Sequence, residues 1–481
     1  MKILKKIITC IIQISLLMLS LSALSTTISG YTDDFDPLVD LAVTVEIQKI
    51  RSLEKVDRQV FTREYIDSDS DPDFYLKVFI NNEEFTSDIW EDTKYIYNPD
   101  WSANLNVPDD EEFVNIRIQL WDWSSDYDRL CDISGSDDYD VELVYSLKTG
   151  HWTGDDDSTG NDPSGYGRLN GCDDGTIYKR DLDCELWFNI FQNDFDNDGI
   201  PYWTEVNVYG TNPEINDIGE DLDEDDCPIE WEWKWGYNPL KWDDHQNIDP
   251  ESDSINNYEE YLTSQWESDP FRKDLFIELD QMQASPNGQN NLLPAGAKEI
   301  LYTVYNRQNV VYHLDDGSWE NSGSDMIPFD DLTERDELNA IYQTYFVNEP
   351  GSDWKSGVFH YGVLIYQYYR VNGCAFGSNR FQVSSNGMEQ KSNNPLLDKD
   401  TVYASAYMHE TGHTFGFWPI GGHNGFSKYP WQIGWWIWRP YKSCMNYGYM
   451  YTTVDYSDGS RVILDYDDWT RMDMTYFEDG W

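Results

Sequence analysis

Positive charge is scarce in this sequence. Its 481 residues include 33 lysines and arginines against 89 aspartates and glutamates, which gives a net charge of −56. Such a surface repels the phosphates of nucleic acids and of anionic lipids, so neither class of partner is expected. The same surface attracts cations, and the carboxylates either form a solvated acidic coat or bind metal ions.

Long apolar runs are also missing after residue 30. Segment 1–30 begins with lysines, continues with an apolar run from about Ile7 to Leu24 and ends in small polar residues. This pattern is typical of an export signal, and an uncleaved membrane anchor is the alternative. Because no later segment is long and apolar enough to span a bilayer, we expect a secreted or cell-surface protein.

Cysteine is rare, with seven in the chain. Cys10 lies in the expected export signal, which leaves an even number in the remaining chain: Cys131, Cys172, Cys184, Cys227, Cys374 and Cys444. Paired cysteines in an exported chain predict disulfide bonds, although the spacing does not choose among the possible pairings. None of the cysteines forms a Cys-x-x-Cys pair, so a cysteine-ligated zinc site is not expected.

Aromatic residues, by contrast, are abundant. The chain has 21 Trp, 34 Tyr and 20 Phe, which favours packed cores over disorder. Its length predicts roughly three domains. Changes in the residue pattern place the domain boundaries near residues 192 and 270, which gives domains at 31–192, 193–270 and 271–481.

Residues 31–192 have the pattern of an antiparallel β-sandwich. Segments 41–47, 74–80 and 114–121 alternate between apolar and polar residues, with turns rich in Asp, Ser, Asn and Gly between them. The stretch resembles a C2 domain in Asp71-Pro72 before a strand, in Asn98-Pro99-Asp100-Trp101, and in Leu120-Trp121-Asp122-Trp123 followed by Asp126 and Asp128. Ser124 stands where such domains carry another carboxylate, which puts calcium binding there in doubt.

Residues 193–270 contain three acidic loops at spacings of about 27 residues. Alternate carboxylates of a tight loop, closed by a glutamate at position twelve, suit a hard cation such as calcium. The expected ligands are Asp194, Asp196, Asp198, Ile200 (through its carbonyl) and Glu205; Asp221, Asp223, Asp225 and Glu232; and Asp249, Glu251, Asp253 and Glu260.

The three loops resemble EF-hand-like and thrombospondin type 3 calcium repeats. The resemblance implies a short spacer stiffened by calcium, whereas a plain acidic linker is the alternative. The first loop has the turn glycine, Gly199, at position six. Asp226 and Ser254 replace it in the later loops, so weaker or distorted sites are expected there.

Residues 271–481 have a mixed α/β pattern. We expect strands at 274–280, 310–314, 358–365 and 379–384, and helices at 295–305, 336–345 and 398–416. The last helix contains His409-Glu410-Thr411-Gly412-His413. Residues four apart share a helix face, so the two imidazoles can bind one metal ion, with Glu410 beside them as general base.

This motif and the residues after it resemble a metzincin, a zinc peptidase whose active-site helix ends at a glycine and is followed by a Met-turn. Gly416 matches the glycine, and Ser443-Cys444-Met445-Asn446-Tyr447 matches the Met-turn. The resemblance implies that Met445 forms an apolar floor under the metal and that Tyr447 serves as a ligand or transition-state donor. Both could instead be ordinary core residues.

The third zinc ligand departs from the family pattern. Pro419 stands where that family has its third histidine, and no Asp or Glu lies between His413 and Asp455. His423 is the only histidine after the helix, and Gly421 and Gly422 would let the chain bend to bring it in. A zinc ion with only two protein ligands is unusual, so His423 is the expected third ligand.

These patterns together predict a multidomain protein: a C2-like β-sandwich, a calcium-loop spacer and a mixed α/β zincin domain with an active-site helix. The expected function is a secreted zinc endopeptidase that acts on protein or peptide substrates, with catalytic Zn²⁺ and structural Ca²⁺. A calcium-dependent surface binding or adhesion protein with a structural or inactive zinc site is the alternative. A zinc hydrolase acting on a non-peptide substrate has no positive sign in the sequence.

Overall fold

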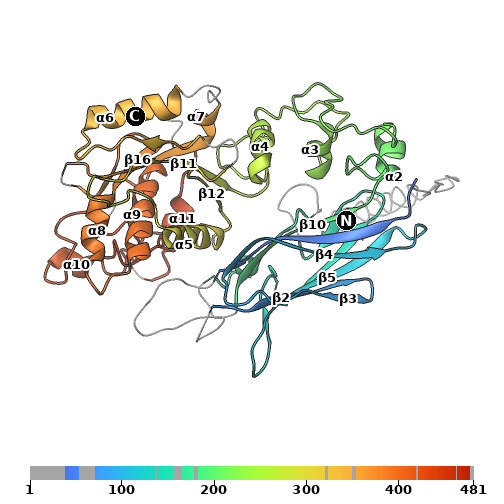
Figure 1. The fold of residues 1–481 in the computed structure, drawn as a ribbon, viewed down its shortest axis with the longest axis horizontal. Helices are drawn as coiled ribbons and strands as arrows, with labels where there is room; N and C mark the ends of the chain where they lie inside the picture. Colours follow the sequence, from blue (N-terminus) through green and yellow to red (C-terminus); the bar gives the residue numbers. More distant parts are fainter. Residues whose placement is uncertain are drawn as a thin grey trace, which may run out of the picture.

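The computed structural model describes residues 38–53, 71–136, 138–156, 165–177, 182–319, 323–348, 354–369, 371–418, 421–461 and 463–476. The expected export signal and Pro419 lie outside these ranges. Among the described residues, no helix is long and apolar enough to cross a membrane. The chain runs from a β-sandwich through a spacer of short helices to an α/β part (Figure 1).

The N-terminal part is built from ten strands and a short 3-10 helix among the described residues: β1 (Ala42–Ser52), β2 (Phe74–Ile80), β3 (Glu83–Thr86), β4 (Tyr95–Asn106), β5 (Phe113–Asp122), β6 (Arg129–Cys131), β7 (Val141–Ser146), β8 (Trp152–Gly154), β9 (Arg168–Asn170), η1 (Gly171–Asp174) and β10 (Cys184–Gln192). One antiparallel sheet has the order β4-β1-β10-β9, and the other β3-β2-β5-β7-β8 with β6 beside β5. Alternate residues of β1 and β5, such as Val43 and Ile116, fill one core. The predicted antiparallel sandwich is confirmed.

The spacer consists of short helical turns that follow the acidic loops: α2 (Tyr202–Thr204), the π-helical turn η2 (Glu205–Tyr209), α3 (Ile229–Lys234), α4 (Asn257–Thr263) and η3 (Ser264–Trp266). Its own core is small and mostly aromatic, and includes Trp231 and Trp235. Tyr166 of the sandwich packs on Trp235 at 4.7 Å between ring centroids. The spacer is therefore packed against the sandwich.

The C-terminal part contains the elements β11 (Asp274–Met282), α5 (Ala295–Asn306), β12 (Val311–Asp315), β13 (Met326–Ile327), α6 (Arg335–Tyr342), η4 (Gln343–Val347), α7 (Lys355–Val358), β14 (Phe359–Ile365), β15 (Gly373–Ala375), β16 (Arg380–Ser384), α8 (Ser385–Ser392), α9 (Lys399–Thr414), α10 (Ile433–Ile437) and α11 (Asp468–Arg471). The sheet order is β12-β11-β14-β16-β15, with β13 beside β11. Strand β15 is antiparallel to β16 and forms one edge, whereas the other strands pair in parallel. The expected mixed α/β pattern is confirmed.

Helices cover both faces of this sheet. Helices α5 and α9 pack on one face, through side chains such as Leu301 and Tyr407. Helix α6 contributes Leu338 and Tyr342 to a second core on the other face (Figure 1). Because α9 lies between the sheet and the C-terminal segment, it is buried along most of its length.

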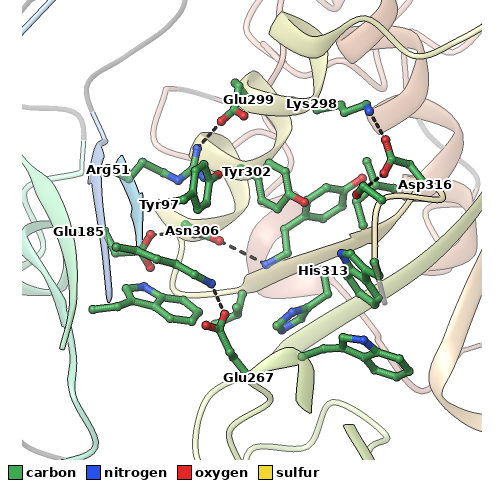
Figure 2. Close-up of a pocket in the computed structure, with 18 of the residues that line it drawn as sticks. Arg51, Tyr97, Glu185, Glu267, Lys298, Glu299, Tyr302, Asn306, His313 and Asp316 are labelled. Atoms are coloured by element: carbon green, nitrogen blue, oxygen red, sulfur yellow. Dashed lines mark hydrogen bonds and ion pairs between the residues drawn. The ribbon is translucent and has the colours of Figure 1, made fainter. Parts of the chain in front are cut away.

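The sandwich and the α/β part also touch directly. Arg51 at the end of β1 forms an ion pair with Glu299 of α5 at 2.8 Å, and its guanidinium stacks over the ring of Tyr302 at 5.0 Å. Lys49 pairs with Glu267 at the same junction. A cavity of about 450 Å³ lies between the two parts, lined by these residues and by aromatic rings (Figure 2). Its lysines and its arginine are held in ion pairs by carboxylates of the cavity wall, which makes it a docking seam between domains.

The predicted disulfide bonds are not found in the part of the chain that the structure describes. No disulfide joins any of the six cysteines outside the expected signal. They are distributed over all three parts of the molecule: Cys131, Cys172 and Cys184 in the sandwich, Cys227 in the spacer core, and Cys374 and Cys444 in the α/β part. Most of them are buried and behave as small apolar side chains; Cys131 and Cys184 share the sandwich core, while Cys227 and Cys444 lie in two other cores.

Candidate metal centres

Helix α9 positions the first two histidines. Asp398 caps its N-terminus by accepting a hydrogen bond from the backbone N–H of Thr401 at 3.0 Å. The helix ends before Gly416, which has a φ of +75° and whose added Cβ would lie 2.9 Å from the Tyr476 ring. Glycine is therefore required there, as the sequence predicted.

The structure brings three imidazoles together. His409 and His413 lie one turn apart on α9, and His423 reaches them from the loop that follows. The Nε2 atoms of His409 and His423 are 3.2 Å apart, and the three possible ligand atoms lie within 4.8 Å of one another. Gly422 has a φ of +83°, and a Cβ there would lie 2.5 Å from Asn446 Oδ1. Glycine thus permits the bend that brings His423 in.

The imidazoles are neutral and oriented. His409 Nδ1 donates to the backbone carbonyl of Cys444 at 2.8 Å, so its Nε2 lone pair points toward His423. Burial lowers the pKa of His409 to about 3 and that of His423 to about 4. The ring of His413 stacks on Trp418 with 3.9 Å between centroids. Neutral nitrogens this close, in a buried site, fit a cation that prefers nitrogen ligands.

Glu410 lies against the edge strand of the sheet. A Cβ on Gly373 of β15 would come within 2.8 Å of the Glu410 carboxyl carbon, so the strand passes close beside this side chain. Burial raises the pKa of Glu410 to about 8, while a hydrogen bond from the Ala375 backbone N–H lowers it. The carboxyl can therefore exchange a proton near neutral pH.

The expected Met-turn residues lie at the same centre. Met445 is fully buried beneath α9, and a Cβ on Gly412 would come 2.6 Å from its sulfur. The ring of Tyr447 lies 4.4 Å from that of His423 and 5.6 Å from that of His409. Burial, and then the charge of Glu410, raises the pKa of Tyr447, so its hydroxyl stays protonated and can donate.

The three acidic loops share one backbone conformation. Positions four and six of each loop lie in the left-handed region: Asn197 and Gly199, Glu224 and Asp226, and Ser252 and Ser254. In each loop the first aspartate accepts backbone N–H groups from both positions, as Asp221 does from Glu224 at 2.8 Å and from Asp226 at 3.0 Å. Asp226 and Ser254 therefore keep the backbone conformation and the hydrogen bond of Gly199, so the later loops are not distorted there; weaker calcium binding at these two sites stays a prediction.

Carboxylates converge in each of the three loops. Both carboxylate oxygens of Asp196, Asp223 and Glu251, the third position of the respective loops, are buried and accept no hydrogen bond. The position-twelve residues Glu205, Glu232 and Glu260 are also buried. Burial raises the pKa of Glu205 to about 8 and that of Glu251 to about 11. Such orphaned oxygens fit a bound cation.

Sequence reasoning missed three residues at these loops. Asp217 lies beside Asp198 and Glu205 in a group that could hold an ion, and its N–H donates to Asp198 at 3.4 Å. The backbone N–H of Asp243 donates to Asp225 in the same way. An aspartate about 20 residues after the start of the loop was therefore the sequence signal that could have predicted both residues. His245 has its Nε2 3.2 Å from Asp225 Oδ2 and 3.7 Å from Glu232 Oε1, a contact with no sequence signal.

The C2-like acidic cluster is arranged differently. Asp122 is buried, and its carboxylate pairs with Arg129 at 2.6 Å. Asp128 accepts hydrogen bonds from the Tyr75 hydroxyl and the Ser124 backbone N–H. The guanidinium of Arg129 therefore neutralises Asp122, the carboxylate that a C2 domain would offer to calcium. This agrees with the doubt about calcium binding that Ser124 raised.

Comparisons with known proteins bear on the sandwich alone. No protein-family model matches the sequence, and no curated protein matches it. Among solved structures, the chain resembles a C2 domain (11% identity, 31% of this chain and 97% of that one, TM-score 0.18). It also resembles a C2 domain of plant extended synaptotagmin 1, with 13% identity over 32% of this chain and 96% of that one and a TM-score of 0.18. A C2 domain protein from Ramazzottius varieornatus has 9% identity over 32% of this chain and 87% of that one, with a TM-score of 0.20. Likenesses at this level carry no argument about function.

Proposed function

We propose that this chain is an exported zinc-dependent endopeptidase. The proposal rests on the convergence of His409, His413 and His423 beside the buried carboxyl of Glu410. Three imidazoles that leave one position open are a ligand set of catalytic zinc sites. The apolar floor made by Met445 and the lysine-led apolar segment 1–30 support the same assignment.

The side chains of the centre divide the chemistry among them. A zinc ion bound by the three imidazoles would supply Lewis acidity, which polarises a peptide carbonyl and acidifies a bound water. Glu410 would accept a proton from the attacking water and deliver it to the leaving nitrogen. The Tyr447 hydroxyl, beside His423, would donate to the developing oxyanion. The Cys444 carbonyl would keep His409 in the tautomer that offers Nε2 to the site.

Strand β15 gives the substrate a place to bind. It is the edge strand of the α/β sheet and passes beside Glu410. An extended peptide can add to such an edge through backbone hydrogen bonds, with little dependence on its side chains. A protein or peptide segment in extended form is therefore the proposed substrate.

The second candidate is a calcium-dependent binding protein with a structural or inactive zinc site. Its support comes from the first half of the chain, where three loops of buried carboxylates join a β-sandwich that has no part in hydrolysis. The two candidates differ in one respect that can be measured, which is whether Glu410 is needed for turnover of a polypeptide.

The test compares the wild-type chain with Glu410→Gln, which keeps the shape of the side chain but cannot act as a base. Zinc content is measured by mass spectrometry, and hydrolysis is measured with casein as the substrate. Both proteins should retain stoichiometric zinc, while the variant should lose about 10²–10⁴-fold of the rate. Asp400→Asn on the first turn of the same helix is the matched control and should keep full activity. Retained zinc with equal hydrolysis in both proteins would favour the second candidate.

A further inference from the structure

The loop between α9 and the Met-turn differs from the rest of the chain in charge. Residues 411–454 contain no aspartate or glutamate, and they include Lys428, Arg439 and Lys442. The whole chain has a net charge of −56. A locally cationic surface therefore lies on a strongly acidic protein.

The same loop exposes several large apolar side chains. Phe426 and Trp431 are each 79% exposed, Ile433 is 78% exposed and Trp436 is 61% exposed. Helix α10 buries none of its residues. Single exposed apolar residues are ordinary, but a concentration of this kind marks an interaction surface. Residues 424–439 are called the aromatic loop below.

Internal hydrogen bonds hold the aromatic loop in shape. The Gln432 side chain donates to the Gly425 carbonyl at 2.7 Å and accepts the Tyr429 backbone N–H at 2.9 Å. The Trp436 indole N–H donates to the Pro430 carbonyl at 2.7 Å. Polar groups thus bond one another inside the loop while apolar rings face outward, an arrangement that water disfavours and an apolar environment stabilises.

The aromatic loop lies at an outer end of the α/β part. Helix α10 is at the far side of this part from the sandwich and the spacer (Figure 1). The loop nevertheless borders the histidine centre, because Lys428 Nζ lies 4.8 Å above the ring of Tyr447. A partner bound to the loop would therefore lie next to the histidine centre and away from the other domains.

We propose that the aromatic loop docks on the surface of a phospholipid bilayer. Trp and Tyr rings beside Lys and Arg are the residues favoured at the boundary between headgroups and acyl chains. Phe426, Trp431 and Ile433 would enter that boundary, and Lys428 and Arg439 would meet headgroup phosphates. A zwitterionic surface suits this protein best, because an anionic one would repel its acidic body.

Other occupants fit the loop less well. A second copy would bring another charge of −56 to the contact, which opposes self-association. An extended peptide needs a strand edge, and a helical one needs a groove, whereas α10 has only five residues and presents protruding side chains. Membrane docking does not depend on the proposed hydrolysis, although it would place the histidine centre at a lipid surface.

The test uses tryptophan fluorescence of the secreted full chain with phosphatidylcholine vesicles that carry brominated acyl chains. Bromine quenches only rings that reach the acyl region, and segment 1–30 contains no tryptophan that could contribute. Wild-type emission should be quenched. The variant Phe426→Ser/Trp431→Ser/Ile433→Ser should need at least about 100-fold more lipid, since each buried side chain contributes about tenfold or more.

The control is Trp242→Ser, which removes another exposed ring (58% exposed) from the acidic spacer and should bind lipid as the wild type does. Matching thermal melts of the triple variant and the wild type confirm folding. Absence of quenching in the wild type, or equal quenching in the triple variant, would overturn the proposal. The proposal would also be overturned if light scattering showed a dimer for the wild type and a monomer for the triple variant. That result would assign the loop to contact with a second copy.

Discussion

The backbone N–H of Asp274 donates to the carboxylate of Asp253 at 2.6 Å. Asp253 is the fifth residue of the third acidic loop, and Asp274 is the first residue of β11. Asp274 also bonds His313 on the neighbouring strand β12. A cation in the third loop would therefore stabilise the start of the α/β sheet as well as the spacer.

Loss of calcium affinity in the third loop should consequently destabilise the α/β part. Burial raises the pKa of Glu260 well above its usual value, and the nearby charges of Asp274 and Asp253 raise it further, so a bound cation would offset the cost of its negative charge. A cation at 100 times its Kd contributes about 2.7 kcal/mol. Glu260→Gln should lower the melting temperature of the α/β part in calcium by about 5–10 °C, measured by differential scanning calorimetry.

Glu205→Gln is the matched control, because Glu205 has the same position in the first loop but lies far from β11 in the chain. It should lower the melting temperature of the spacer and leave that of the α/β part unchanged. Equal shifts of the α/β transition in both variants would show that the third loop has no special link to the sheet.

The stability of the spacer should depend on pH in opposite ways with and without calcium. Burial raises the pKa of Asp198 to about 6, of Glu232 to about 7 and of Glu205 to about 8. In the unfolded chain these carboxyls titrate near pH 4. Without metal, the folded form is therefore favoured at low pH, and that advantage is lost as the pH rises through about 6 to 8.

Spacer melting in a chelator should thus occur at a lower temperature at pH 8 than at pH 5. With saturating calcium the order should reverse, because protons compete with the cation for the same carboxylates. Circular dichroism melts at the two pH values, each with chelator or calcium, test both statements. Identical melting at pH 5 and pH 8 in the chelator would mean that the loops do not bury their carboxylates as described.

Local patterns in the sequence predicted most of the secondary structure. Alternation in segments 74–80 and 114–121 located β2 and β5, and the buried apolar runs located β11 and β14, because side-chain period follows directly from strand geometry. The four-residue spacing of His409 and His413 placed both on one helix face. These features depend only on neighbours in the sequence.

Long-range features were harder to predict. The glycines before His423 indicated the bend, but the packing of Gly422 against Asn446 had no local pattern to predict it. Asp226 and Ser254 hold glycine-like turns because of hydrogen bonds to the first aspartate of each loop. An even number of cysteines also proved a poor guide to disulfide bonds: Cys131 and Cys184 share the sandwich core and still form none, because pairing depends on the geometry of two thiols and not on their count.

Replacement of Tyr447 should separate transition-state donation from metal binding. Tyr447→Phe keeps the ring beside His423 but removes the hydroxyl. If that hydroxyl stabilises the oxyanion, kcat should fall by about 100-fold while zinc content and KM stay close to those of the wild type. Tyr449→Phe, whose hydroxyl bonds the Arg439 carbonyl instead, is the control. A loss of zinc in Tyr447→Phe, or no change in kcat, would remove Tyr447 from the proposed chemistry.

The seam between the sandwich and the α/β part should be held chiefly by Arg51. Its side chain is buried, pairs with Glu299 at 2.8 Å and lies over the ring of Tyr302. Hydrogen bonds to charged groups contribute about 1.5–3 kcal/mol, and the partial exposure of Glu299 favours the lower end of that range. Arg51→Met should therefore cost about 2 kcal/mol, measured by urea unfolding of the full chain.

A double-mutant cycle with Glu299→Gln distinguishes the ion pair from simple packing. If the pair itself contributes, the combined variant should lose less than the sum of the two single losses, since each single variant already breaks the contact. Lys94→Ala removes the more exposed pair between Lys94 and Asp71 at 3.2 Å, and should cost no more than about 0.5 kcal/mol. Additive losses in the cycle would show that Arg51 acts through its contacts with the tyrosine rings rather than through Glu299.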